Sequence, residues 1–217
     1  MKLWGAGTAR SFRPIWVAEE LGLEYELDPI GPRTGETKTD AYKALTRKQK
    51  IPFLVDGDVR LSESVAICRY LIGAYPANDL SAPETIKESV KEDEWCCYVY
   101  GEIDETSLYV IRRHRDLAEV YGASENAVKA ASAYAAIHFG ILGEHLTKHD
   151  VLMERGFSLP DILLVSCIDW ALFYNVQVPS SVQAYRSRIA QRPAYQRAMQ
   201  INYKDLMGEI DAAVNGN

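Results

Sequence analysis

Residues 51–71, with the sequence IPFLVDGDVRLSESVAICRYL, decide the fold of this chain. Pro52 precedes the apolar residues 53–55, and proline suits the start or edge of a strand because it has no N–H to give to a ladder. The sequence DGD at residues 56–58 separates two β-prone segments and predicts a hairpin turn. Beyond it the apolar side chains recur at helical spacing. We therefore expect two short strands, followed by a helix that begins near residues 62–64.

The place where this hairpin meets the helix suits a ligand with a peptide backbone, a carboxylate and an amine. A strand beside a proline can pair with an extended peptide, and a helix N-terminus offers unpaired N–H groups and a partial positive charge to a carboxylate. Glu63 adds a negative charge for an ammonium group. The alternative is that Ser62 or Ser64 is an ordinary N-cap and that the Ile51–Pro52 bond is trans, as most such bonds are.

Composition and charge exclude several classes of protein. The chain has 217 residues, 47% of them hydrophobic and 25% charged, which fits one large domain or two small ones. The net charge of −6 argues against nucleic acid as a partner. No apolar run approaches the roughly 20 residues of a membrane span. Arg10 and Arg13 interrupt what would have to be the apolar core of a signal peptide, so we expect a cytoplasmic protein without a membrane partner.

The cysteines and histidines do not predict a metal site. The four cysteines, at positions 68, 96, 97 and 167, show neither CxxC nor metal spacing, and they are expected to be reduced thiols. His145 and His149 stand at helical spacing without an evident third ligand.

The chain divides into a mixed portion and a helical portion. Residues 1–75 predict the element order β-α-β-α-β-β-α, residues 76–83 predict a linker, and residues 84–217 follow the helical period throughout. Before the hairpin we expect a strand at residues 1–7, a helix at 11–22, a strand at 23–30 and a short helix at 40–45. In the second portion we expect helices at residues 84–116, 122–147, 158–173, 180–191 and 193–213.

One helix start in the second portion has a specific signature. Ser158 and Asp161 stand at capping-box spacing, Pro160 falls in the first turn, and an apolar helix follows. The serine of such a cap contributes about 1 kcal/mol because it satisfies an N–H group that the helix leaves unpaired.

These motifs together resemble the cytosolic glutathione transferases. The pair Ile51-Pro52, with Glu63-Ser64 opening a helix soon afterwards, looks like the glutathione-binding half of that family. The motif at residues 158–161 is similar to the cap of the family's core helix, and residues 190–195 resemble the break before its last helix. The resemblance extends from residue 3 to about residue 198. It implies a thioredoxin-like α/β N-terminal domain followed by an all-α C-terminal domain, the glutathione transferase fold.

The resemblance also implies where glutathione binds. In the family the proline is cis, the residue before it, here Ile51, pairs with the cysteinyl backbone, and the pair Glu63-Ser64 holds the γ-glutamyl end. Upstream the family usually has Asn-Pro-x-Gly-x-Val-Pro, whereas this chain has TRKQKIP at residues 46–52. Lys50 matches the family's Lys or Gln position for the glycyl carboxylate best, with Lys48 and Gln49 as further candidates. The alternative is a solvated basic loop.

Thiol chemistry requires a donor that stabilises the thiolate, because a free thiol with a pKa near ~8.5 is a poor nucleophile at neutral pH. In the family this donor lies at the N-terminus of the first helix. Alignment on the family's arginine and Glu-Glu-x-Gly landmarks places Thr8 where serine-type members, including bacterial or fungal ones, carry their serine; the class stays unassigned. Ser11 is the reserve candidate, and Arg10 would assist by charge. The alternatives are N-cap or turn hydroxyls and a solvated arginine.

The second substrate, an electrophile, is expected between the domains, beside the first long helix of the second portion. The residues within reach by sequence order are Trp95, Tyr98, Tyr100, Tyr109, Arg112 and Arg113. The alternative is that these aromatic residues belong to the core.

We therefore expect a glutathione transferase that uses glutathione as its co-substrate, needs no metal, and activates the thiol for attack on a small hydrophobic electrophile. The resemblance implies a detoxifying, cytoplasmic homodimer. Two other functions stay open. One is a non-enzymatic binding or scaffolding module of the same fold, and the other is a glutathione-dependent isomerase or dehalogenase, which would use the same activated sulfur.

Overall fold

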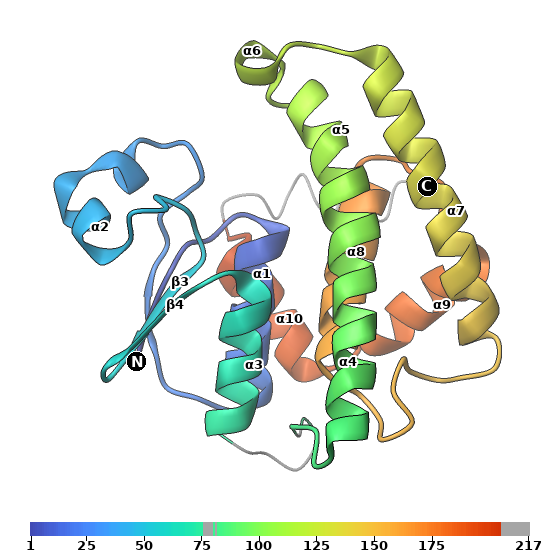
Figure 1. Ribbon diagram of the computed structural model, residues 1–217, viewed down its shortest axis with the longest axis horizontal. Helices are drawn as coiled ribbons and strands as arrows, with labels where there is room; N and C mark the ends of the chain where they lie inside the picture. The colour runs from blue at the N-terminus through green and yellow to red at the C-terminus, as the bar shows by residue number, and fades with distance from the viewer. Residues whose placement is uncertain (76–79, 81, 205–217) are drawn as a thin grey trace. The chain divides into compact units, whose positions relative to one another are not determined.

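The computed structural model describes residues 1–75, 80 and 82–204. The chain divides into two compact units: Met1–Ala82 together with the described residues from Ala190 onward, and Pro83–Ile189 (Figure 1). The predicted division into residues 1–75, 76–83 and 84–217 stays a prediction, since most of the expected linker lies outside the described residues.

The first unit contains a four-stranded sheet with the strand order β2-β1-β3-β4. Its strands are β1 (Lys2–Trp4), β2 (Glu26–Asp28), β3 (Phe53–Asp56) and β4 (Val59–Ser62). β1 is parallel to β2 and antiparallel to β3, and β3 pairs with β4 across the predicted hairpin. The thioredoxin-like fold class expected from the sequence is thus confirmed, with β2 at the edge where its alternation predicted it.

The two faces of the sheet are covered by different helices (Figure 1). On one face, the tilted rings of Trp4 and Phe53 contact each other at 5.9 Å between centroids and form a core cluster with Tyr42 of α2 (Asp40–Leu45). α1 (Ala9–Glu20) and α3 (Ser64–Ala74) cover the other face, and Leu3 and Leu54, which alternate with Trp4 and Phe53 along β1 and β3, are buried. Successive strand residues point to opposite faces, so both layers are required to bury β1 and β3. A short 3₁₀ turn, η1 (Glu36–Lys38), precedes α2.

A helix from the end of the chain belongs to this first unit. α10 (Pro193–Asn202) packs along α1, and the ring of Tyr195 meets those of Phe12 and Trp16 edge-on at 5.6 and 5.1 Å. Arg192 adds a bidentate ion pair to Glu20, at 2.7 and 2.8 Å. The predicted helix at 193–213 is confirmed to residue 202, and residues 205–213 lie outside the described residues. Its place beside α1 was not evident from the helical period.

In the described part of Pro83–Ile189 the regular elements are helices. They are α4 (Ile86–Tyr98), the π-helix η2 (Val99–Leu108), α5 (Tyr109–His114), α6 (Ala118–Tyr121), α7 (Glu125–Leu146), α8 (Leu159–Phe173) and α9 (Ser180–Ile189). The helix expected at residues 84–116 is continuous, but its middle has π geometry, which no sequence signal predicted. α6 was also unexpected. No helix in the described ranges is both long and apolar enough to cross a bilayer.

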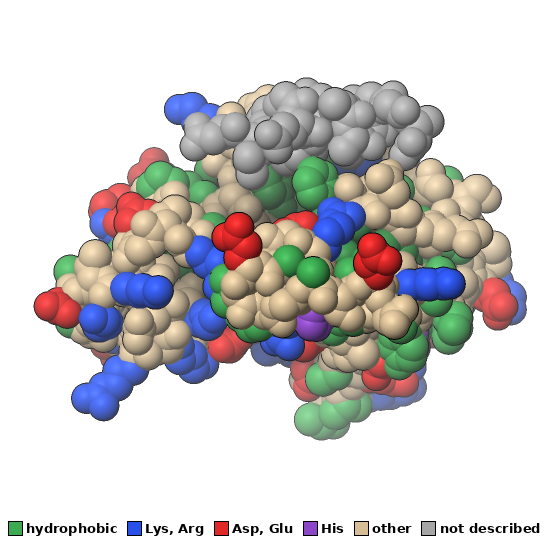
Figure 2. Space-filling view, turned by 90° about the horizontal axis from the view of Figure 1, so that it is seen from above, with side chains coloured by type: hydrophobic (Ala, Val, Ile, Leu, Met, Phe, Trp, Pro, Cys, Tyr) green, Lys and Arg blue, Asp and Glu red, His purple; other side chains and the backbone are tan. Residues whose placement is uncertain are grey.

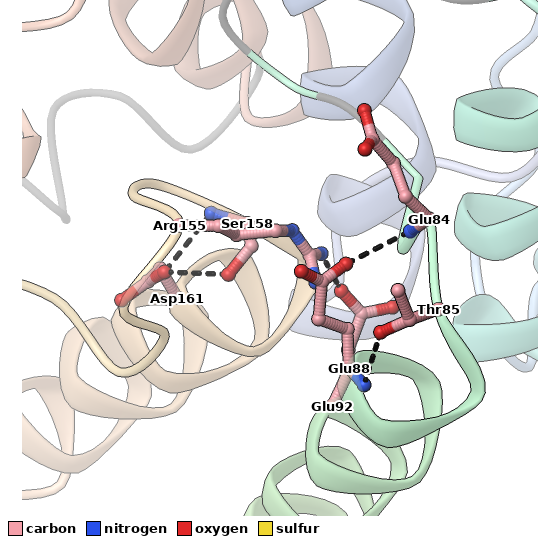
Figure 3. A network of polar contacts seen from close by, with 7 residues as sticks. All are labelled: Glu84, Thr85, Glu88, Glu92, Arg155, Ser158 and Asp161. Carbon is pink, nitrogen blue, oxygen red and sulfur yellow. Dashed lines mark hydrogen bonds and ion pairs between the residues drawn. The ribbon is translucent and has the colours of Figure 1, made fainter.

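The start of α8 lies beside the start of α4 in a buried polar network (Figure 3). The capping box of Ser158 and Asp161 is confirmed, and the Asp161 carboxylate also accepts hydrogen bonds from Leu152 N (2.9 Å) and the Tyr185 hydroxyl (2.7 Å). Arg155 forms an ion pair with the buried Glu92 of α4 in the same network. Burial raises the pKa of Asp161, while its four donors oppose that rise.

Candidate functional site

The predicted glutathione-binding segment begins with a cis peptide bond between Ile51 and Pro52. Ile51 is half-buried and lies against Gly5, which follows β1. A Cβ on Gly5 would be only 2.6 Å from the Ile51 Cβ, and the backbone of Gly5 has a φ of +111°. Both the lack of space and the positive φ require glycine at this position. Gly5 thereby allows the end of β1 to lie against Ile51, the residue expected to pair with the backbone of a peptide.

Glu63 and Ser64 stand at the N-terminus of α3, as predicted. Glu63 occupies the N-cap position with a φ of +76°, and its side chain is 57% exposed. Ser64 is buried, and the Arg13 guanidinium donates to its hydroxyl at 3.4 Å. Arg13 itself is fully buried, so it joins α1 to the start of α3. The sequence did not predict this role of Arg13, because a contact across 51 residues leaves no local signal.

The basic loop before Pro52 has an ordered turn although it lacks the proline and glycine usual in the resembled family. The N–H of Gln49 donates to the Thr46 carbonyl at 3.3 Å, and Gln49 has a φ of +52°. The Tyr42 hydroxyl donates to the Lys50 carbonyl at 2.8 Å, while the Lys50 side chain is exposed. Lys48 extends to Glu63, at 2.9 Å between Nζ and Oε1. Lys50 thus keeps an open position, whereas Lys48 lies on the Glu63 side of the site.

Thr8 and Ser11 form a capping box at the N-terminus of α1. The Thr8 hydroxyl accepts a hydrogen bond from Ser11 N at 3.0 Å, and the Ser11 hydroxyl accepts from Thr8 N at 3.1 Å. The two hydroxyl oxygens are 2.8 Å apart. Ser11 is fully buried, whereas Thr8 is 9% exposed. Thr8 is therefore the N-cap and Ser11 the third residue of the helix, and Thr8 alone of the two reaches the surface. Arg10 is half-buried in the same turn.

Asn202, at the end of α10, holds this turn from the other end of the chain. Its side-chain amide donates to the Thr8 carbonyl at 3.1 Å, its side-chain oxygen accepts from the Ser11 hydroxyl at 2.9 Å, and its backbone carbonyl accepts from Gly7 N at 2.8 Å. Sequence reasoning missed Asn202 because nothing local links residue 202 to residue 8. The Thr8 turn is thereby fixed by contacts within the first unit.

The residues proposed for the electrophile lie in separate clusters of the second unit. Trp95 and Tyr98 contact each other at 6.1 Å between ring centroids, and both face α7, where the Tyr98 hydroxyl bonds His138 at 2.8 Å. Burial raises the pKa of Tyr98 to about 12. Further along, the Arg113 guanidinium lies 4.6 Å from the Tyr109 ring. Tyr100 and Arg112 are half-buried. An electrophile site formed by these residues stays a prediction.

The two histidines at helical spacing stack on each other. The rings of His145 and His149 are 4.4 Å apart, and His145 also contacts Trp95 at 4.9 Å. Burial, followed by the nearby His149, lowers the pKa of His145. Within the described ranges no three His, Cys, Asp or Glu side chains gather as metal ligands.

On the face shown in Figure 2, basic and acidic side chains are interspersed.

Comparisons with known proteins bear on this site. A family model described as "Glutathione S-transferase, N-terminal domain" matches residues 1–72. The chain is 26% identical to "Glutathione S-transferase F9" of Arabidopsis thaliana over 212 residues, which cover 92% of this chain and 96% of that protein. It is also 24% identical to "Elongation factor 1-gamma 2" of Oryza sativa subsp. japonica over 209 residues, which cover 96% of this chain and 48% of that protein.

Among solved structures, the chain is similar to the theta class glutathione S-transferase of Xanthomonas axonopodis pv. citri, which was solved with glutathione bound. The TM-score is 0.75 at 26% identity, and the match covers 91% of this chain and 95% of that one. Together with the N-terminal domain match and a curated relative over almost the full length, this similarity supports placing the chain in the glutathione S-transferase family.

Proposed function

We propose that this protein is a glutathione S-transferase in which Thr8 activates the thiol of bound glutathione. The proposal rests on three features that all belong to the first unit. The half-buried Ile51 lies against Gly5, Glu63 and Ser64 open α3, and Thr8 opens α1 three residues after Gly5. Glutathione needs a partner for its peptide backbone, for its γ-glutamyl charges and for its sulfur, and each feature supplies one of these.

Glutathione would be held along the segment from Lys50 to Pro52 and at the start of α3. Ile51 would pair with the cysteinyl backbone, and Lys50 would attract the glycyl carboxylate. The γ-glutamyl carboxylate would meet the unpaired N–H groups of α3 and the Ser64 hydroxyl, and its ammonium would meet Glu63. Substituting alanine for Glu63 should therefore abolish measurable glutathione binding and leave the fold intact, because the side chain is exposed.

Thr8 would donate its hydroxyl hydrogen to the sulfur. The same oxygen accepts Ser11 N, and its hydrogen, which the Ser11 hydroxyl can accept at 2.8 Å, can turn instead to an acceptor outside the turn. The α1 N-terminus and Arg10 would add positive potential, and each of these contributions favours the thiolate over the thiol. Ser11, fully buried and bonded to Asn202, would support Thr8 rather than touch the sulfur. The activated sulfur would then attack a small hydrophobic electrophile in a detoxification reaction.

A glutathione titration followed by the ultraviolet absorbance of the thiolate across pH tests the proposal. Wild type should bind glutathione and lower its thiol pKa. Thr8→Val, which keeps the shape and removes the hydroxyl, should bind with the thiol pKa near that of free glutathione. Ser11→Ala should keep a lowered pKa. A wild-type complex with an unshifted thiol pKa would contradict thiol activation, and no binding would contradict the glutathione site.

One observation favours a second candidate, a non-enzymatic scaffolding module. The chain is similar over 96% of its length to about half of an elongation factor 1-gamma, and its Thr8 has the geometry of an ordinary N-cap. The titration separates the two candidates, because a scaffold has no need of a lowered thiol pKa.

We further propose a cytoplasmic homodimer. Ile86 and Val90 stand one turn apart on α4 and are 80% and 55% exposed, which leaves an apolar strip that a second copy of the chain would cover. Sedimentation of wild type and of Val90→Lys checks this, since a dimer that uses the strip should dissociate on the substitution. A wild-type monomer would contradict it.

A further inference from the structure

Lys48 contacts Glu63, and its position in the sequence does not predict this contact. Its Nζ is 2.9 Å from Glu63 Oε1, and both side chains are 57% exposed. Neither side chain has another polar partner among the described residues. Its position in the sequence makes Lys48, like Lys50, a candidate for the glycyl end of glutathione. The structure separates these two lysines.

The loop geometry accounts for the separation. The Thr46 side chain accepts Lys48 N at 3.4 Å and the Thr46 carbonyl accepts Gln49 N at 3.3 Å, which closes a tight turn. Gln49, between the two lysines, then takes a left-handed φ of +52°, which bends the chain there. Tyr42 fixes the Lys50 carbonyl beyond the turn. Lys48 and Lys50 are therefore positioned by different contacts and serve different parts of the surface.

Lys48 and Glu63 make a pair of opposite charges beside a helix N-terminus. An ammonium group has three donors, and the Glu63 carboxylate uses one of them, so Lys48 keeps donors for another acceptor. The Glu63 carboxylate likewise keeps Oε2 for another donor. The first N–H groups of α3 lie at the same place. A group that carries a carboxylate and an ammonium on one carbon matches this arrangement of charges.

We propose that Lys48 and Glu63 form a mixed-charge clamp for the zwitterionic amino-acid end of a γ-glutamyl ligand. Glu63 Oε2 receives the ammonium, and Lys48, together with the α3 N-terminus, receives the carboxylate. Lys48 also offsets the repulsion that Glu63 would otherwise exert on that carboxylate. Lys48 is then a specificity residue of the γ-glutamyl end, and the glycyl end is left to Lys50. This inference rests on the proposed function.

Ligand truncation distinguishes the two ends. We would measure binding of glutathione and of γ-glutamylcysteine, which lacks the glycine, by calorimetry to wild type, Lys48→Met, Lys48→Arg and Lys50→Met. Lys48→Met should weaken both ligands by the same factor, ~5-fold, as expected for one exposed charge-assisted hydrogen bond. Lys48→Arg should restore both. Lys50→Met, the matched control, should weaken glutathione and leave γ-glutamylcysteine unchanged.

Two results would overturn the clamp while the proposed function stands. If Lys48→Met weakened glutathione alone, Lys48 would belong to the glycyl end. If it weakened neither ligand, the pair would be a surface ion pair only, of a kind that often contributes nothing measurable. If wild type bound neither ligand, the proposed function itself would fail, and the clamp with it.

Discussion

The helices α1 and α8 begin with the same kind of capping box, yet the two boxes differ in whether a hydroxyl hydrogen can turn to a ligand. At α8 the third residue of the helix is Asp161, a carboxylate, and at α1 it is Ser11, a hydroxyl. Ser158 is fully buried, whereas Thr8 is 9% exposed. The comparison separates a closed cap, which stabilises a core helix, from a cap that retains a hydrogen for a ligand.

The α8 box is closed because its donors converge on one carboxylate. Asp161 accepts the N–H and hydroxyl of Ser158 at 3.0 and 3.1 Å, as well as Leu152 N and the Tyr185 hydroxyl. If any of these hydrogens pointed elsewhere, a buried donor would lose its partner, which lowers the free energy of unfolding by about 1–3 kcal/mol. The box therefore has no hydrogen to offer a ligand.

The α1 box is different because hydroxyls both donate and accept. The Thr8 carbonyl already accepts Phe12 N at 2.9 Å and the Asn202 amide, so the single hydrogen of Ser11 is best placed on the Asn202 side-chain oxygen. In the 2.8 Å hydrogen bond between the two hydroxyls, Thr8 is then the donor and Ser11 the acceptor. If that hydrogen turns to a sulfur, Ser11 keeps both its donor, Thr8 N, and its acceptor, Asn202. No buried donor is left unpaired.

The largest expected effect on stability is at the closed cap. Asp161→Ala removes the acceptor of three residues at once, so we expect a loss of about 4 kcal/mol in the free energy of unfolding. Urea denaturation followed by circular dichroism measures it. Val182→Ala, a buried truncation elsewhere in the same unit, is the control for lost packing alone. A loss from Asp161→Ala no greater than that of the control would refute the closed-cap interpretation.

A local pattern in the sequence predicted the α8 cap, and the reason is physical. A capping box, a hairpin turn and a helix start depend on residues within a few positions, so Ser158, Asp161 and residues 56–58 were placed correctly. Likewise the edge position of β2 followed from its alternating polarity. These are the parts of the fold in which local preference and the tertiary structure agree.

The contacts that shape the site could not be predicted in this way. Asn202 meets Thr8 across 194 residues, Arg13 meets Ser64 across 51, and Lys48 meets Glu63 across 15. Each depends on how helices and loops pack, which the spacing of residues along the chain does not encode. The resemblance supplied candidates for the two ends of the site, but only the structure shows the contacts between them.

The second prediction concerns the open cap. Thr8→Val should lower turnover by about 10²-fold, the usual cost of removing one preorganised donor. It should lower stability by only about 1 kcal/mol, as loss of an N-cap does. Thr8→Ser should retain activity because it keeps the hydroxyl. Turnover with a general electrophile and glutathione checks both variants, and full activity in Thr8→Val would remove Thr8 from the mechanism.

Ser158→Ala is the matched control for that experiment. It removes the N-cap hydroxyl of the closed box and should lower stability by about 1 kcal/mol, like Thr8→Val. Turnover should not change, because the Ser158 hydroxyl bonds Asp161 and is fully buried. Thermal unfolding and steady-state kinetics on the same samples give both quantities. A loss of turnover in Ser158→Ala equal to that in Thr8→Val would mean that the two caps act alike, through stability.

The smallest expected effect is at another carboxylate, Asp56, which contrasts with the buried Asp161. The hydroxyls of Tyr75 and Tyr70 donate to Asp56 Oδ2 at 2.5 and 2.9 Å, and the Tyr75 hydrogen bond is the main cause of a lowered Asp56 pKa. A carboxyl whose pKa is lower in the folded state than its ordinary 3.8 stabilises the fold above that pH. The contribution is then lost as the pH falls through the lowered value.

Tyr75→Phe should therefore be slightly less stable than wild type at neutral pH, and the difference should shrink as the pH falls below 3.8, the ordinary value of the carboxyl. Urea unfolding at neutral pH and at steps below pH 4 measures the difference between the two proteins. Tyr70→Phe should show the same trend with a smaller amplitude, since its hydrogen bond contributes less to the lowered pKa. A difference that grew on acidification would mean that Asp56 is bound more tightly in its protonated form, and so resembles the buried Asp161 rather than an ionised surface carboxylate.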